Sequence, residues 1–307
     1  MRYFMFSAVL LVIFGLSGQA PAAERFPVCG AYYSALLGRS VPYCYERSHP
    51  EAPALSGEPV VYFMHGIGGS ARSWVDNGYS EALHVVAHEA RGMSAATFVS
   101  FDTSGTSFFS DAGGSVSSPS SYETWLTLEF MPFVEQKLDL CRQRKCRLIA
   151  GLSMGGLGAI KTALRHPDLF AAVAANSPAL PAMNLWEDPS RWIAYFSGKP
   201  VGPLKGFGLI AAARTVFTSW DLSDGSDPSY LVTHFGGPAV FPALYWDMGT
   251  DDYFGFEDGS ERFKKALSDH ALPFEEHMIQ GGTHELFRER RFDLIRFIRD
   301  RLKEDLH

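Results

Sequence analysis

Residues 148–155 read Leu-Ile-Ala-Gly-Leu-Ser-Met-Gly, and this stretch gives the strongest indication of the fold. Its apolar first half predicts a short buried strand, and the small residues that follow at 156–165 predict a helix. Between the two lies the pattern Gly-x-Ser-x-Gly, centred on Ser153. A strand, a tight turn and a helix around this pattern predict a nucleophile elbow, which holds the serine oxygen above the end of the strand.

The flanking glycines, Gly151 and Gly155, fit this interpretation because such a turn is crowded and strained at its central residue. The helix that begins there offers free N–H groups to a developing negative charge. A plain glycine-rich turn with a solvated serine has the same pattern. The assignment of Ser153 as a nucleophile therefore depends on its partners elsewhere in the chain.

The composition of the 307-residue chain is that of a soluble globular protein, with 46% hydrophobic and 20% charged residues. This length allows two domains, although α/β folds of this size are often single. The formal net charge is -7, and no stripe of lysine and arginine stands out. Nucleic acid is therefore not expected as a partner.

The N-terminus has the pattern of a secretory signal peptide. Arg2 precedes an apolar run at 6–16, and a small-residue cleavage site follows at 20–22. The run is too short for a comfortable membrane span, and an uncleaved anchor is the alternative. We expect residues 1–22 to be removed, with cleavage after Ala22 or Ala23. The protein is then exported, periplasmic or secreted, without stable membrane insertion.

All four cysteines lie beyond the predicted signal peptide. An even number in an oxidising compartment predicts two disulfides. Of the three pairings, proximity in sequence favours Cys29 with Cys44 and Cys141 with Cys146. No C-x-x-C pair or nearby histidine accompanies them, which disfavours a zinc site.

One histidine pair has the spacing of a metal site. His84 and His88 stand four residues apart on a predicted helix, a spacing that can bind a metal ion. No glutamate completes the H-E-x-x-H pattern and no third ligand is evident, so a solvated helix face is favoured. We expect no metal and no other cofactor.

Strands alternate with helices along the mature chain. Strands are expected at residues 41–45, 59–64, 95–101, 148–150, 169–175, 241–248 and 273–279, the first of them at a sheet edge. Helices are expected at 80–90, 122–138, 156–165, 259–270 and 285–302. This alternation predicts an α/β fold with a mostly parallel central sheet and helices on both faces, in a single domain at 23–307.

Two segments depart from this alternation. Residues 176–235 lack a clean period and hold three tryptophans among prolines and glycines. We interpret them as a helical excursion over the strand ends, where insertions usually set specificity; scattered aromatics pack more often than they bind. The loop at 102–121, which carries Phe108 and Phe109, is long enough to line a site.

A glycine-rich loop, His-Gly-Ile-Gly-Gly at residues 65–69, follows the strand predicted at 59–64. An oxyanion hole in this fold takes one N–H from the residue after the nucleophile and another from the loop after an early strand. Met154 and Ile67 are expected to supply them, with Gly68 the alternative to Ile67. A plain glycine-rich turn is the competing interpretation.

A serine hydroxyl needs a base within hydrogen-bond reach, and this fold places an acid and then a histidine after its later strands. Asp251 and Asp252 follow the strand predicted at 241–248, and we prefer Asp252. His284 follows the last predicted strand, in a loop with two glycines before it. His277 lies inside that strand and His270 ends a helix, so both are poorer bases.

These residues predict an acyl-enzyme mechanism. His284 takes the Ser153 proton and Ser153 attacks an ester carbonyl. The N–H groups of Met154 and Ile67 hold the oxyanion. Asp252 orients and charge-stabilises His284, and water then releases the acid.

The motif-bearing segments together resemble the esterase D, feruloyl esterase and antigen 85 branch of the α/β-hydrolases, over nearly the whole mature chain. The segments are residues 64–70, 122–133, 151–156, 249–254 and 282–284, of which 122–133 is quite specific. In that family the acid lies in an Asp-x-Phe context, which falls on 252–254 and supports Asp252. The usual aromatic residue a few positions after the catalytic histidine is here Leu286-Phe287.

The resemblance implies ester chemistry and leaves the substrate open. A member acting on S-formylglutathione would be expected in the cytoplasm, which the predicted signal peptide contradicts. Members outside the cytoplasm suggest carbohydrate-linked acyl esters or acyl transfer between sugars. We expect an exported serine carboxylesterase for a small-molecule or carbohydrate-linked ester, of a sugar or a phenolic acid. An acyltransferase with the same triad is the second hypothesis, and a catalytically silent binding protein on this scaffold is the third.

Overall fold

A computed structural model of the chain describes residues 27–90, 92–103, 105–114, 120–285 and 288–304. The predicted signal peptide at 1–22 and the pair at 286–287 lie outside the described residues. Within these ranges, no helix is long and apolar enough to cross a membrane.

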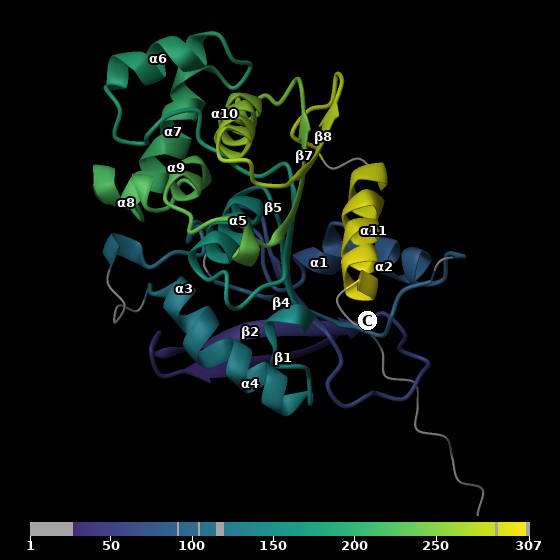
Figure 1. Cartoon of the computed structure of the whole chain (residues 1–307). Helices are drawn as coiled ribbons and strands as arrows, with labels where there is room; N and C mark the ends of the chain where they lie inside the picture. Colours follow the sequence, from purple (N-terminus) through teal and green to yellow (C-terminus); the bar gives the residue numbers. More distant parts are fainter. Residues whose placement is uncertain (1–26, 91, 104, 115–119, 286–287, 305–307) are drawn as a thin grey trace, which may run out of the picture.

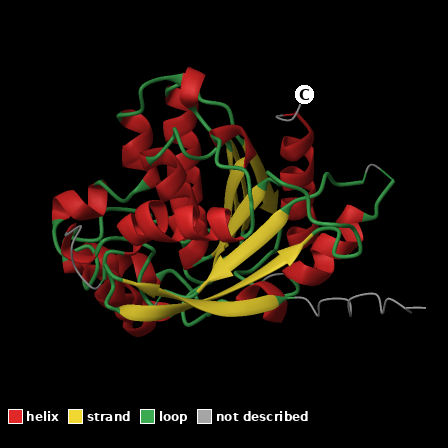
Figure 2. Ribbon diagram, turned by 90° about the horizontal axis from the view of Figure 1, so that it is seen from below, coloured by secondary structure: helices red, strands yellow, loops and turns green. Residues whose placement is uncertain are grey.

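The described residues form one sheet of eight strands in the order β1-β2-β4-β3-β5-β6-β7-β8 (Figures 1 and 2). The strands are β1 (Val28–Ser34), β2 (Arg39–Arg47), β3 (Val60–Met64), β4 (Thr97–Phe101), β5 (Arg147–Leu152), β6 (Ala172–Asn176), β7 (Ala243–Gly249) and β8 (Glu275–Ile279). The pairs β1–β2 and β2–β4 are antiparallel, and every pair from β4 to β8 is parallel. The predicted α/β fold with a mostly parallel sheet is confirmed.

Helices cover both faces of this sheet. The helices are α1 (Ser73–Asp76), α2 (Tyr79–Ala87), α3 (Tyr122–Trp125), α4 (Met131–Lys137), α5 (Met154–Arg165), α6 (Pro189–Ser197), α7 (Gly202–Arg214), α8 (Trp220–Asp224), α9 (Pro228–Thr233), α10 (Phe256–Asp269) and α11 (Arg288–Glu304). Shorter helical turns are η1 (Ala112–Gly114), η2 (Leu126–Phe130), η3 (Arg144–Cys146) and η4 (Pro238–Val240). Figure 1 shows α2 and α11 side by side, and the two helices are in contact.

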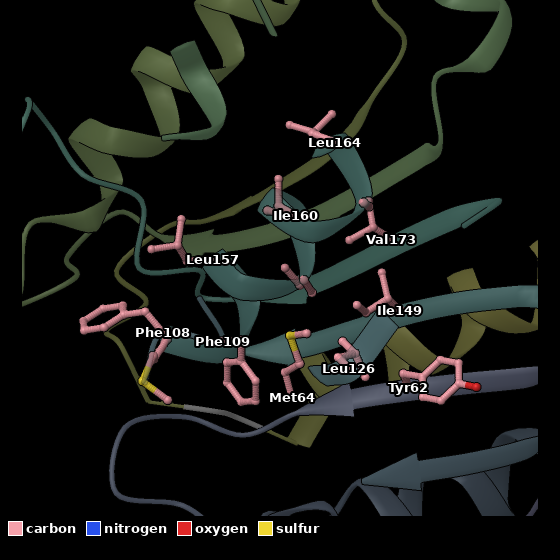
Figure 3. Packing of buried hydrophobic residues seen from close by; sticks show 14 of the residues in the cluster. Tyr62, Met64, Phe108, Phe109, Leu126, Ile149, Leu157, Ile160, Leu164 and Val173 are labelled. Atoms are coloured by element: carbon pink, nitrogen blue, oxygen red, sulfur yellow. The ribbon is translucent and has the colours of Figure 1, made fainter. Parts of the chain in front are cut away.

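Neighbouring residues of the central strands point to opposite faces, and each face has its own buried apolar cluster. Tyr62 and Ile149 belong to the cluster that includes Ile160 of α5, as Figure 3 shows. Phe63, one residue along β3, belongs to the cluster on the other face, with Leu83 of α2. Burial on both faces explains why these strands read as continuous apolar runs.

The strand predicted at 41–45 exists, but its prediction as an edge strand was wrong. β2 lies between β1 and β4, and β1 forms the edge of the sheet. Cys29 of β1 stands opposite Cys44 of β2, and the two form one disulfide; Cys141 and Cys146 form the other, as proximity favoured. The sequence did not predict β1 because most of its residues are exposed, so it has no apolar run.

The segment at 122–138, expected as one helix, contains a change of helical pitch. α3 runs into the π-helical turn η2 before α4 begins. Pro132, in the first turn of α4, cannot donate the N–H that a continuous α-helix needs at this point. The wider turn just before it is the kind of local irregularity that interrupts α-helices.

Between β6 and β7 the chain leaves the sheet and forms α6 to α9. These helices lie within the excursion expected at 176–235, and Figure 1 shows them in green, grouped beside α10. α6 and α7 pack on each other, while α9 contacts both α5 and α10. The group therefore lies against α5, the helix that follows Ser153.

Candidate active site

The turn at Ser153 joins β5 to α5 and has strained geometry. Ser153 has φ 55° and ψ -116°, a conformation that costs energy for any residue with a side chain. A Cβ atom on Gly155 would lie 2.1 Å from the carbonyl oxygen of Met64, and one on Gly151 would lie 2.2 Å from the carbonyl oxygen of Gly155. Both positions therefore require glycine, which is the physical reason for the Gly-x-Ser-x-Gly spacing.

Three of the residues selected from the sequence are hydrogen bonded in series. His284 Nε2 lies 2.9 Å from Ser153 Oγ, and His284 Nδ1 lies 2.7 Å from Asp252 Oδ2. Asp252 is 1% exposed, and its other oxygen accepts a hydrogen bond from the Phe254 N–H at 2.8 Å. With neutral His284 protonated at Nδ1, Nε2 is free to accept the serine proton.

The other acid and histidine candidates of the sequence lie outside this series. Asp251 is exposed and accepts a hydrogen bond from the Thr250 hydroxyl at 3.1 Å. His270 is exposed and bonds through Nδ1 to the carbonyl of Ala266. His277 is paired with Glu275. None of these side chains takes part in the series around Ser153.

The loops that carry Asp252 and His284 are joined through their backbones. A Cβ atom on Gly249 would lie 2.1 Å from the carbonyl oxygen of Gly282, so only glycine permits this approach. The Asp251 N–H donates to the same oxygen at 2.9 Å. This contact sets the position of one loop relative to the other.

Arg290, which was not predicted from the sequence, fixes the loop of His284 through hydrogen bonds. It is 2% exposed, and its Nη1 donates to the carbonyls on either side of His284, those of Thr283 at 3.1 Å and Glu285 at 2.9 Å. The same guanidinium is paired with the buried carboxylate of Asp247 at the end of β7. Nothing in the sequence distinguishes this arginine from the others on α11.

Replacing Arg290 with alanine should lower the free energy of unfolding by about 3–5 kcal/mol, because Asp247 is left as an unpaired buried charge. Urea unfolding of the purified variant measures the change. Arg288→Ala is the matched control: Arg288 pairs with Glu81 on the surface, and its loss should cost less than about 1 kcal/mol. Equal losses in the two variants would contradict this role for Arg290.

The glycine-rich loop after β3 lies next to Ser153. The Gly68 N–H donates to the carbonyl of Gly105 at 2.8 Å, so it is already engaged, whereas Ile67 lines the space around Ser153. Met154 is the first residue of α5, where N–H groups have no partner within the helix. His65 is buried and bonds through Nδ1 to the carbonyl of Gly66 at 2.8 Å. Burial lowers the pKa of His65, which keeps its ring neutral.

A buried lysine anchors the long loop at 102–121. Lys161 of α5 is fully buried, and its Nζ donates to the carbonyl of Phe109 at 2.9 Å and pairs with Glu123 at 2.9 Å. Burial alone would raise the pKa of Glu123, but Lys161 and its other cationic neighbours hold that pKa far below its usual value. Phe108 and Phe109 both have positive φ angles, and Figure 3 shows them near Leu157 and Met64.

Two hollows meet at Ser153. One is a narrow apolar pocket of about 90 Å³ between α5 and the helices of the excursion, with Phe108, Leu157 and Ile210 among its walls. The other is an open polar cleft of about 610 Å³, and His284, Glu285 and Arg291 line it. Ser153, Ile67 and Phe254 line both.

The structure gives His84 and His88 separate partners. His84 Nε2 pairs with Glu46 at 2.7 Å, and His88 Nδ1 bonds to the carbonyl of His84. Among the described residues, ligand atoms that converge within 4.8 Å occur at one surface cluster, which consists of His49, Glu51 and His88.

Comparison with known proteins places the chain in a family. Residues 44–200 match the model of the family described as "Putative esterase". Esterase Rv1288 of Mycobacterium tuberculosis (strain ATCC 25618 / H37Rv) is 24% identical over 230 residues, which are 73% of this chain and 48% of that protein. The chain thus spans about half the length of the curated relatives it matches.

Solved structures share the fold over most of both chains. A ferulic acid esterase aligns with TM-score 0.62 and 21% identity, over 89% of this chain and 98% of its own. An S-formylglutathione hydrolase from Agrobacterium tumefaciens aligns with TM-score 0.64 and 20% identity, over 90% and 93%. MPT51 (FbpC1) of Mycobacterium tuberculosis aligns with TM-score 0.62 and 14% identity, over 91% and 99%. The chain has the α/β-hydrolase fold and belongs to this esterase family.

Proposed function

We propose that the protein is a serine carboxylesterase with Ser153 as nucleophile, His284 as general base and Asp252 as the acid that orients His284. The observation that carries this proposal is the hydrogen-bonded series from Asp252 through His284 to Ser153, at a strained turn between a strand and a helix. Family membership supports ester hydrolysis independently.

The mechanism follows from this geometry. His284 Nε2 accepts the hydroxyl proton as Ser153 Oγ attacks the ester carbonyl carbon. The N–H groups of Ile67 and Met154 stabilise the oxyanion, since the Gly68 N–H is engaged with Gly105. His284 then gives its proton to the departing alcohol, leaving Ser153 acylated. Water, deprotonated by His284, attacks the acyl-enzyme and releases the carboxylic acid.

This mechanism also orients the substrate. The departing alcohol must lie on the side of His284, because His284 gives it a proton. His284 lines the polar cleft and does not line the apolar pocket. The alcohol therefore occupies the polar cleft, where Asn77 and Glu285 offer hydrogen-bonding groups, and the acyl group enters the apolar pocket. A polar alcohol such as a sugar suits this cleft better than an apolar one.

Export is part of the proposal. Two disulfides, Cys29–Cys44 and Cys141–Cys146, favour an oxidising compartment such as the periplasm or the cell exterior. The N-terminal pattern of charge, apolar run and small residues agrees with this location.

Hydrolysis and acyl transfer are separated by one assay. Purified protein is incubated with p-nitrophenyl acetate, with and without an added sugar alcohol, and the products are analysed by mass spectrometry. Because the polar cleft is open and gives water access to the acyl-enzyme, we expect acetate as the main product under both conditions. Predominant acetyl transfer to the sugar alcohol would favour the acyltransferase, and no turnover of any ester would contradict the proposed function.

A further inference from the structure

The apolar pocket beside Ser153 is small and enclosed by the helical excursion. Its volume is about 90 Å³. Its walls come from α5, α6 and α7 and from the segment after α7, and include Leu157, Trp192, Phe196, Ile210, Ala213 and Phe217. All six side chains are buried. These walls are therefore part of the packed structure.

We propose that this pocket selects an aliphatic acyl group of about five or six carbons. The proposal rests on the proposed esterase function and adds the class of acyl group to it. An apolar cavity of about 150 Å³ holds benzene, with six carbons, so a pocket of about 90 Å³ holds about three or four. The carbonyl carbon and its neighbour lie at Ser153, outside this count.

The packing of α6 on α7 sets the upper limit on acyl-chain length. A Cβ atom on Gly206 of α7 would lie 2.3 Å from the ring of Phe196, so this ring rests directly on the glycine backbone. Trp192, one turn earlier on the same face of α6, stacks on Phe196 with ring centroids 5.4 Å apart. Both rings line the pocket. A longer chain can enter only by displacing them.

The polar groups among the lining residues give little support to a polar acyl group. Ser223 Oγ accepts a hydrogen bond from the Leu185 N–H at 3.0 Å. The two carboxylate oxygens of Asp227 accept from the Ser229 N–H and from Arg262. The indole nitrogen of Trp192 has no hydrogen-bond partner but is inaccessible, so a polar acyl group reaches it only if the ring moves. A hydroxylated or charged acyl group would lose its water without gaining equivalent partners.

The test is the dependence of kcat/KM on acyl length, measured with p-nitrophenyl acetate, butyrate, hexanoate, octanoate and dodecanoate. Each buried methylene group should raise kcat/KM by about fourfold, so butyrate should exceed acetate by about 15-fold. The maximum is expected at hexanoate, with a fall of at least about tenfold by dodecanoate. A maximum at any other ester of the series, or faster release of ferulate from methyl ferulate, would overturn the proposal.

Matched variants on α7 test whether the pocket determines the acyl-chain selectivity. Ala213 lines the pocket and is 4% exposed, whereas Ala211 on the same helix is exposed. Ala213→Phe should lower the hexanoate-to-acetate ratio of kcat/KM by about 50-fold or more, and Ala211→Phe should leave it within about threefold of the wild type. Ile210→Ala has the opposite effect: it enlarges the pocket and should move the maximum of kcat/KM toward octanoate. Equal ratios in all three variants would contradict selection by this pocket.

The activity of the wild type distinguishes a wrong function from a wrong acyl selection. If the proposed function is wrong, the wild type turns over no ester, including acetate. If only the acyl selection is wrong, the wild type still hydrolyses acetate but shows a flat profile or a maximum elsewhere.

Discussion

Replacement of Ser153 by alanine should lower the kcat of p-nitrophenyl acetate hydrolysis by up to about 10⁶-fold. The reason is that, among the residues the structure describes, Ser153 is the nucleophile placed on His284: the ring bonds to Ser153 Oγ through Nε2 and to Asp252 through Nδ1. What remains in the variant is the contribution of the oxyanion hole and of substrate binding. The measurement is steady-state kinetics on purified protein.

The controls for this variant separate lost chemistry from lost structure. The Ser153→Ala protein should keep the circular dichroism spectrum and urea midpoint of the wild type, because the substitution removes one oxygen and retains the Cβ atom. Ser268→Ala changes an exposed serine on α10 and should retain full activity. A folded Ser153→Ala protein with near-wild-type turnover would refute the assignment of the nucleophile.

Asp252→Asn should lower kcat by about 10⁴-fold with little change in structure. A carboxylate accepts the Nδ1 proton of His284, but an amide NH₂ at the same place donates to Nδ1 instead. The proton of the neutral ring then moves to Nε2, which can no longer accept the serine proton. Steady-state kinetics with p-nitrophenyl acetate measures the loss.

Asp251→Asn is the matched control for this effect. Asp251 is adjacent in sequence but exposed, and its bonds are to Thr250 and to the backbone of the histidine loop. Its kcat should stay within about threefold of the wild type. The opposite ranking of the two variants would transfer the role of the acid to Asp251.

The central sheet could be predicted from the sequence because its strands are buried on both faces. β3 and β5 are continuous apolar runs, and such runs carry a strong signal. β1 gave no such signal because it is an exposed edge strand, held by its ladder to β2 and by the Cys29–Cys44 disulfide. The sequence therefore wrongly predicts β2 as the edge strand.

The site residues could be predicted from the sequence where their order in the chain and their position after strand ends identify them. Ser153, Asp252 and His284 each follow a strand, and glycines around them are required by close backbone contacts. Arg290 and Lys161 were not accessible, because their importance arises from buried contacts with segments distant in the sequence. Single positions on amphipathic helices do not reveal such partners.

The apolar pocket beside Ser153 could not be predicted from the sequence, for the same reason. The excursion at 176–235 could be recognised because it lacks a helical or strand period. The walls of the pocket, however, form where α6 and α7 meet Leu157 of α5. Trp192 illustrates the difficulty: it both packs on Phe196 and lines the pocket. Composition alone predicts the first role and not the second.

The most direct test of the account is covalent labelling with a fluorophosphonate, followed by tryptic digestion and mass spectrometry. Trypsin releases Ser153 in the peptide at residues 148–161, which contains no other serine. We predict stoichiometric phosphonylation of this peptide in the wild type and none in Ser153→Ala. An unlabelled peptide at 148–161 in folded wild-type protein, or equal labelling of the two proteins, would contradict the claim that Ser153 is an activated nucleophile.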